Sequence, residues 1–228
     1  MKPYIICYML SSVDGRIECS VLDSLIGERD YDEVKEELKG DAWLCGRVTM
    51  EIHHADPEPF LSKTNQSVGV SSVHVAQKAD SYAICADTFG KLNWASNMLE
   101  GEPIICVLSQ QVTDDYLEML RQKEISYIVA GQEKIDLARA VELLGEHFGT
   151  RRLLLEGGGH INAGFLEAGL IDELCLLIAP GIDGRQGIPT IFEGISPEKN
   201  EAVSLKLQNV RQFPSGAVCL RYILSKML

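Results

Sequence analysis

One short stretch of the chain places an acidic side chain directly before three consecutive glycines. Leu153–Leu155 form an apolar run long enough for one buried strand, and Glu156 ends that run. Gly157–Gly159 can bring the main chain close to a ligand, and His160–Ala168 has its apolar residues at helical spacing. A strand, a glycine turn and a helix in this order leave N–H groups at the positive end of a helix dipole. Such a turn suits a phosphate or pyrophosphate group.

Simpler explanations of the same residues stay open. A glycine-rich turn can be no more than a tight connection between a strand and a helix. Glu156 can act as a partner of the dipole of the helix that follows it.

Turn residues follow three other predicted strands, and the last of these strand ends, at Thr88 and Lys91, is where an open α/β sheet would bind a ligand. They are Ser12 and Asp14 after Tyr4–Leu10, Gly46 and Thr49 after Ala42–Cys45, and Thr88 and Lys91 after Ser81–Ala86. A turn accounts equally well for Asp14, a helix N-cap for Thr49 and a solvated lysine for Lys91.

The elements that must position these residues alternate along the chain. Further strands are predicted at Pro103–Leu108, Ile125–Ala130 and Leu174–Ala179, and helices at Asp30–Leu38, around Tyr116–Leu120 and around Leu137–Leu144. The alternation predicts an α/β fold with right-handed crossovers and a mixed, mostly parallel central sheet with helices on both faces.

Two further segments complete this prediction. Val203–Val210 and Ala217–Leu224, separated by a short Pro- and Gly-containing turn, predict a C-terminal antiparallel hairpin. His54–Val73 is polar and carries two prolines, which predicts a long surface loop.

The composition predicts a single globular domain over residues 1–228, with 46% hydrophobic and 24% charged residues. A net charge of −12 argues against nucleic acid and anionic membranes as partners, and the N-terminal apolar run is too short to span a membrane. Seven scattered cysteines without a CxxC pair predict buried thiols and a cytoplasmic location. Adjacent His53 and His54 would point in different directions, so no metal site is expected.

The longer segment from Leu155 to Gly184 carries a resemblance to a known family. It reads LEGGGHINAGFLEAGLIDELCLLIAPGIDG and resembles the reductase domain of the bifunctional riboflavin-biosynthesis deaminase-reductases, whose fold is dihydrofolate reductase-like. SVDGRI at 12–17 and GRVT at 46–49 resemble two earlier motifs of that family.

The resemblance implies an NADPH-dependent reductase that transfers hydride to a pyrimidine-like substrate. It implies a pyrophosphate site at Gly157, Gly158, Gly159, His160, Ile161 and Asn162, a nicotinamide-ribose site at Gly46 and Thr49, and a 2′-phosphate site at Thr88 and Lys91. The loop with Ser12 and Asp14 would lie over the nicotinamide and the substrate. Reduction also requires a proton, for which Glu156, a substrate ligand in the family, is our first choice and Asp14 our second. A homodimer is a further implication.

The chain departs from the family pattern on the substrate side. Glu37 stands where the family has an arginine that binds the substrate's phosphate, and no arginine follows Ala55-Asp56-Pro57, the trace of a second such motif. These 228 residues also lack the H-x-E and PCxxC motifs of the zinc deaminase half. The departures favour another pyrimidine, a pterin or a small carbonyl compound. A nucleotide-binding paralogue or sensor without turnover and a dimeric scaffold are the alternatives.

Overall fold

The structure is a computed structural model that describes residues 1–196, 198 and 202–225. The chain divides into two compact units, each assembled from separate stretches of sequence. Unit 1 consists of residues 1–3 and 41–153, and unit 2 consists of residues 4–40 and 154–228. Strand β8 (Arg152–Leu155) lies where the chain passes from unit 1 to unit 2.

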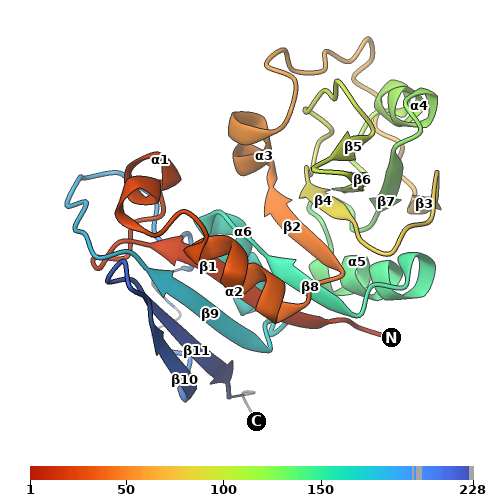
Figure 1. Cartoon of the computed structure of the whole chain (residues 1–228). Coiled ribbons are helices and arrows are strands. Elements are labelled where there is room, and N and C mark those ends of the chain that lie inside the picture. The colour runs from red at the N-terminus through yellow and green to blue at the C-terminus, as the bar shows by residue number, and fades with distance from the viewer. Residues whose placement is uncertain (197, 199–201, 226–228) are drawn as a thin grey trace. The chain divides into compact units, whose positions relative to one another are not determined.

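Unit 2 carries the N-terminal and C-terminal strands. Its strands are β1 (Tyr4–Ser11), β9 (Glu173–Ile178), β10 (Leu205–Gln212) and β11 (Val218–Leu224), and its helical segments are α1 (Cys19–Leu22), η1 (Asp23–Leu25), α2 (Asp30–Leu38) and α6 (Gly159–Glu167). The strands follow the order β10-β11-β9-β1-β8, with β1 and β9 parallel and the two C-terminal strands antiparallel. The hairpin β10–β11 therefore puts β10 at the edge (Figure 1).

The apolar pattern of unit 2 explains its core. Seven of the eight residues of β1 are buried, as expected for a strand with apolar side chains on both faces. Helix α2 buries Val34 and Leu38 and leaves its acidic face in solvent. The rings of Tyr8 on β1 and Tyr31 on α2 stack at 4.5 Å, so that this helix lies against the strand.

Unit 1 contains the remaining sheet strands. They are β2 (Ala42–Gly46), β3 (Ser72–His74), β4 (Ala83–Ala86), β5 (Met98–Leu99), β6 (Glu102–Leu108) and β7 (Ser126–Val129), accompanied by α3 (Arg47–His53), α4 (Asp114–Gln122), α5 (Leu137–Leu143) and η2 (Leu144–Phe148). Strands β2, β4, β6 and β7 are successive parallel neighbours, whereas β3 pairs antiparallel with β7. The expected mixed, mostly parallel strand arrangement with a C-terminal antiparallel hairpin is thus confirmed.

The predicted loop at His54–Val73 required one correction. Its last two residues belong to β3, a half-buried edge strand of three residues that is too short to show an alternating pattern. The rest of the segment is tied to the ends of β4 and β6: the N–H of Phe60 donates to the carbonyl of Lys91, and the N–H of Val68 donates to that of Val112. Within the described part of the chain, no helix is long and apolar enough to cross a lipid bilayer.

Candidate active site

Glu156 is held at the end of β8 by two side chains of α2. The Nζ of Lys35 lies 3.1 Å from Oε1 and 3.2 Å from Oε2 of the carboxylate, and the hydroxyl of Tyr31 donates to Oε2 at 3.3 Å. The Glu156 side chain is 11% exposed and that of Lys35 is 29% exposed. The pair is thus partly withdrawn from water, where charge pairing is stronger than at the open surface.

Lys35 and Tyr31 were not among the predicted site residues. The sequence placed Tyr31 on the apolar side of the helix and Lys35 on its polar side. Their spacing of four residues was the available signal, because residues at i and i+4 share one face of a helix. Only the fold shows that this face meets Glu156.

The glycine turn between β8 and α6 has the shape that its sequence predicts. Gly157 has a φ of +86°, which side chains other than hydrogen rarely tolerate. A Cβ at Gly159 would collide with the carbonyl oxygen of Thr190. Both positions therefore require glycine for folding, while Gly158, with a φ of −65° at the N-cap of α6, does not require it for its backbone angles.

The start of α6 is only partly accessible. Gly159 is buried against the carbonyl oxygen of Thr190, whereas His160 is exposed and Ile161 is partly exposed. Among the described residues, the N–H groups of Gly159, His160 and Ile161 have no hydrogen-bond acceptor. N–H groups without an acceptor at the start of a nine-residue helix fit an anionic pyrophosphate, which would approach from the side of His160 and Ile161.

The side chain of Asn162 lies in the interior, away from the open side of the α6 start. Its side chain is fully buried and donates to the carbonyl of Ile191 at 2.9 Å. The N–H of Glu193 donates to the carbonyl of Gly159 at 3.1 Å, so that residues 190–193 lie along the start of α6. Asn162 thereby fixes a neighbouring segment, and its own N–H donates to the carbonyl of Gly158 at 3.2 Å.

Ser12 and Asp14 join two loops of unit 2. The Asp14 carboxylate accepts hydrogen bonds from the Ser12 hydroxyl at 2.6 Å and from the N–H groups of Asp183 at 3.0 Å and Gly184 at 2.9 Å. These bonds, the Ser12 bond foremost, hold the pKa of Asp14 well below its usual range. A carboxylate stabilised in its ionised form is a poor proton donor, so this geometry argues against Asp14 in that role.

The other predicted cofactor residues lie in unit 1. Gly46 ends β2, and Thr49 lies inside α3, which begins at Arg47; the alternative of Thr49 as an N-cap is therefore wrong. Thr88 and Lys91 lie in the turn after β4, and the Lys91 side chain is exposed. The predicted residues thus divide between the two units, with Ser12, Asp14 and residues 156–162 in unit 2 and the remaining four in unit 1.

Comparison with known proteins identifies the family. The model of the RibD C-terminal domain matches residues 3–219. This chain belongs to the RibD C-terminal domain family. Within that family, a 2,5-diamino-6-ribosylamino-4(3H)-pyrimidinone 5′-phosphate reductase of Methanothermobacter thermautotrophicus is 31% identical over 211 residues, which cover 91% of this chain and 92% of the relative. The reductase of the same name from Aquifex aeolicus is 26% identical, with 87% of each chain covered. The chain is thus a member of the pyrimidine reductase family.

Solved structures show the same RibD-type fold. A pyrimidine reductase-like protein of Corynebacterium diphtheriae has a TM-score of 0.74 at 19% identity, covering 99% of this chain and 93% of that one. RibD of Acinetobacter baumannii has a TM-score of 0.67 at 20% identity, covering 98% of this chain and 58% of that one. The predicted dihydrofolate reductase-like fold is confirmed.

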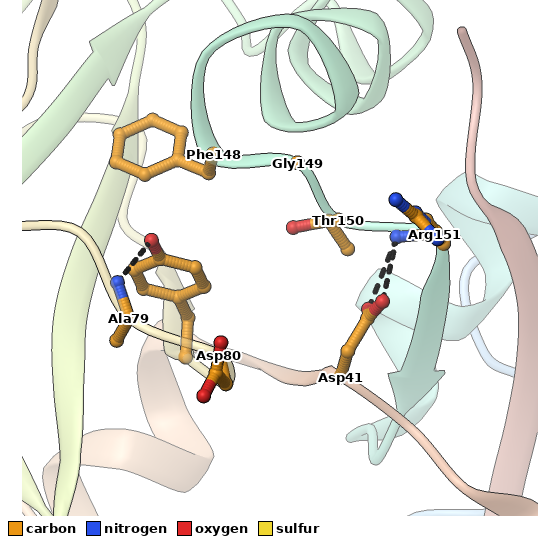
Figure 2. A pocket seen from close by; sticks show the side chains of 8 residues that line it. Asp41, Ala79, Asp80, Phe148, Gly149, Thr150 and Arg151 are labelled. Atoms are coloured by element: carbon orange, nitrogen blue, oxygen red, sulfur yellow. Dashed lines mark hydrogen bonds between the residues drawn. The ribbon is translucent and has the colours of Figure 1, made fainter.

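The chain has a separate cavity that is lined by none of the predicted site residues. It measures about 320 Å³, lies within unit 1 and is lined by Asp41, Ala79, Asp80, Tyr82, Phe148, Gly149, Thr150 and Arg151 (Figure 2). The Asp41 carboxylate is already engaged by the N–H groups of Arg151 and Arg152. Among the described residues, no group of three His, Cys, Asp or Glu side chains is placed to hold a metal ion.

Proposed function

We propose that this chain is an NADPH-dependent reductase that transfers hydride to a pyrimidine-like substrate. One observation carries the proposal. Glu156, paired with Lys35 and Tyr31, directly precedes a glycine turn, and in the part of the chain that the structure describes the next three helix amides, those of residues 159–161, have no acceptor. The carboxylate would bind the substrate beside the site of the cofactor's diphosphate. Family membership supports the reductase class.

The free amides at the start of α6 fit the cofactor. With a net charge of −12, the chain as a whole repels a dinucleotide, so a local source of positive potential is needed. The N–H groups of Gly159, His160 and Ile161 provide it at the positive end of the helix dipole. When bound, NADPH supplies the hydride; Gly46 and Thr49 would contact its nicotinamide ribose, and Thr88 and Lys91 its 2′-phosphate.

Beside Glu156, the proposed substrate ligand, lies a cation that the family motif did not suggest, Lys35. At position 37, Glu37 faces away from the site and pairs with Arg211 of β10 at 2.6 Å. On the other face of the same helix, Lys35 pairs with Glu156. We propose that Lys35 and Tyr31 supply the donor protons next to Glu156, so that this cluster passes one proton to the nitrogen or oxygen of the bond whose carbon receives the hydride.

The phosphorylated pyrimidine named for the Methanothermobacter relative is the first substrate to test. A dephosphorylated pyrimidine or a pterin is the next, since the two arginines of the family motifs are missing. Each charged hydrogen bond lost to a phosphate weakens binding by about 1.5–3 kcal/mol.

We further propose a cytoplasmic homodimer. The described free cysteines are buried, as in proteins of reducing compartments. Among the described strands, β10 has a partner on one side only, and it carries three exposed apolar side chains, Leu205, Leu207 and Val210. Pairing of this edge with a second copy would cover them.

The test combines binding and turnover. Calorimetric titration with NADPH should give saturable binding, and absorbance at the nicotinamide band should fall when a pyrimidine of this class is added. NADPH binding without oxidation across pyrimidines, pterins and diketones would favour the non-catalytic paralogue. Absence of any shift in melting temperature with NADPH would argue for a scaffold, because a tight ligand stabilises the folded state by mass action.

A further inference from the structure

Asp87 is a buried acidic residue to which the proposed reaction assigns no role. It directly follows β4, and none of its surface is exposed. Its Oδ2 atom accepts hydrogen bonds from the N–H of Lys91 at 2.6 Å and from the N–H of Leu92 at 2.9 Å. These two bonds close the turn that carries Thr88 and Lys91.

The second oxygen of this carboxyl group faces the interior of unit 1. Within the residues that the structure describes, Oδ1 of Asp87 has no hydrogen-bond partner, and neither do the buried Trp94 Nε1 and Tyr116 hydroxyl. Burial raises the pKa of Asp87 from its ordinary value. A buried polar atom without a partner costs free energy, which opposes the stabilisation that the two hydrogen bonds of Oδ2 give to the turn.

Two further contacts hold the turn that carries Thr88 and Lys91. The hydroxyl of Ser109, itself fully buried, donates to the carbonyl of Thr88 at 2.8 Å. Gly90 lies directly against the ring of Tyr116, since a Cβ there would be 2.5 Å from Cδ1 of the ring. The backbone of the turn is therefore held at both of its ends and in its middle.

With its backbone fixed, the turn presents a ring and a cation to solvent. Phe89 is 52% exposed, and the Nζ of Lys91 lies 5.7 Å from the centre of its ring. Thr88 adds a partly exposed hydroxyl-bearing side chain. A ring, a hydroxyl and an ammonium together suit a phosphorylated purine nucleoside.

We propose that Asp87 is a positioning residue that sets the preference for NADPH over NADH. By holding Lys91 and Leu92 through their backbone, it fixes the Thr88 and Lys91 side chains toward the 2′-phosphate. The inference rests on the proposed function, because it requires the coenzyme's adenosine end to lie on this turn. NADH lacks the 2′-phosphate. Disorder in the turn should therefore weaken the binding of NADH less than it weakens the binding of NADPH.

Titration calorimetry with NADPH and NADH tests the proposal on the whole protein. Asp87→Ala should raise the Kd of NADPH about tenfold and that of NADH no more than about threefold. Asp87→Asn should keep the NADPH Kd within about threefold of the wild type, because its amide oxygen still accepts both N–H bonds.

Asp41→Ala is the matched control. Asp41 also accepts backbone N–H bonds in unit 1, at 2.9 Å from Arg151 and 2.9 Å from Arg152, but it lines the separate cavity (Figure 2). This variant should lower the melting temperature and leave the ratio of the two Kd values unchanged.

The outcomes separate this inference from the proposed function. An unchanged NADPH-to-NADH ratio in a folded Asp87→Ala variant overturns the role of Asp87 and leaves the reductase proposal standing. If Asp87→Ala does not fold, Ser109→Ala decides the matter. It removes the hydroxyl bond to the carbonyl of Thr88 and leaves only the backbone N–H bond to that carbonyl. It should raise the Kd of NADPH about threefold more than that of NADH, and an unchanged ratio of the two Kd values overturns the inference. A wild-type protein that binds no NADPH overturns both.

Discussion

Glu156 owes its orientation to two neighbours that lie one helical turn apart. Lys35 and Tyr31 approach its carboxylate from the same face of α2, and Tyr31 is in turn stacked on Tyr8. A carboxylate whose hydrogen-bond partners are themselves held by packing keeps a defined orientation toward a substrate. The three residues should therefore act as a unit, with non-additive effects on activity.

Glu156→Gln should separate the chemical role of this residue from cofactor binding. The amide keeps the size of the side chain but loses its charge and its capacity to pass a proton. We expect kcat/KM to fall by about 10²–10⁴ with an unchanged Kd for NADPH, measured by steady-state kinetics and calorimetry. Activity equal to that of the wild type would remove Glu156 from the mechanism.

Lys35→Met should lower kcat/KM by about 10- to 100-fold, because it removes a charge-assisted bond to a carboxylate that is largely withdrawn from water. Arg29→Met, at the N-cap of the same helix, is the control. Its ion pair with Glu36 has both side chains more than two-thirds exposed and should contribute little. Equal effects of the two variants on steady-state kinetics would show that Lys35 is no more than a surface charge.

Among the connecting elements, the loops at 12–17 and 181–184 are joined by Asp14. Because the pKa of this residue is lowered in the folded state, its stabilising contribution is present above the ordinary value of 3.8 and is lost as the pH falls below it. Asp14→Asn should therefore lower the melting temperature at pH 7 and pH 5, whereas the difference from the wild type should shrink below about pH 3.8.

Circular dichroism melts across this pH range check the prediction. Asp80→Asn, at an exposed carboxylate without a hydrogen bond among the described residues, should show no such pattern. A constant difference between wild type and Asp14→Asn down to pH 2 would mean that the loop contacts do not depend on the charge of Asp14.

Helix α6 and its glycine turn form the element that the cofactor proposal depends on most. Gly158→Val places a bulky group at the turn without demanding a positive φ, so it should block the approach of a diphosphate to the amides. We expect the Kd for NADPH to rise by at least about tenfold, measured by calorimetry.

Ala168→Val is the matched control, because it adds a similar bulk at the exposed opposite end of the same helix. It should leave the Kd unchanged. If a folded Gly158→Val protein bound NADPH as tightly as this control, the diphosphate would not lie on the glycine turn.

At the scale of the whole molecule, the family match runs from residue 3 to residue 219 and includes parts of both compact units. We therefore propose that residues 1–228 form one reductase domain. The amides predicted to bind the diphosphate belong to unit 2, and the turn of Lys91 belongs to unit 1.

Leu207→Lys should dissociate the proposed dimer, because it places a charge in the exposed apolar edge of β10. Light scattering should then report the mass of one chain in place of two. Leu61→Lys, at an 80% exposed position in the long loop of unit 1, should not change the mass. A wild-type protein that is already monomeric at high concentration would contradict the proposal.

The sequence by itself determined most of the elements and the glycine turn. Tyr4–Ser11, Asp30–Leu38 and the C-terminal hairpin could be predicted because apolar periodicity and turn residues act over a few neighbours. Short segments such as β3 and α3 escaped prediction, since three to seven residues carry too little pattern. The motif around Gly157–Gly159 could be recognised for the same local reason.

Only the tertiary structure decided which side chains meet. Lys35 and Glu156 are 121 residues apart, and Asp14 and Gly184 are 170 apart. No periodicity relates such positions, because their contact depends on which helix face packs on which strand end. Asp87 differs, because its partners Lys91 and Leu92 are only four and five residues away. For this residue the tertiary structure decided that the carboxyl group is fully buried.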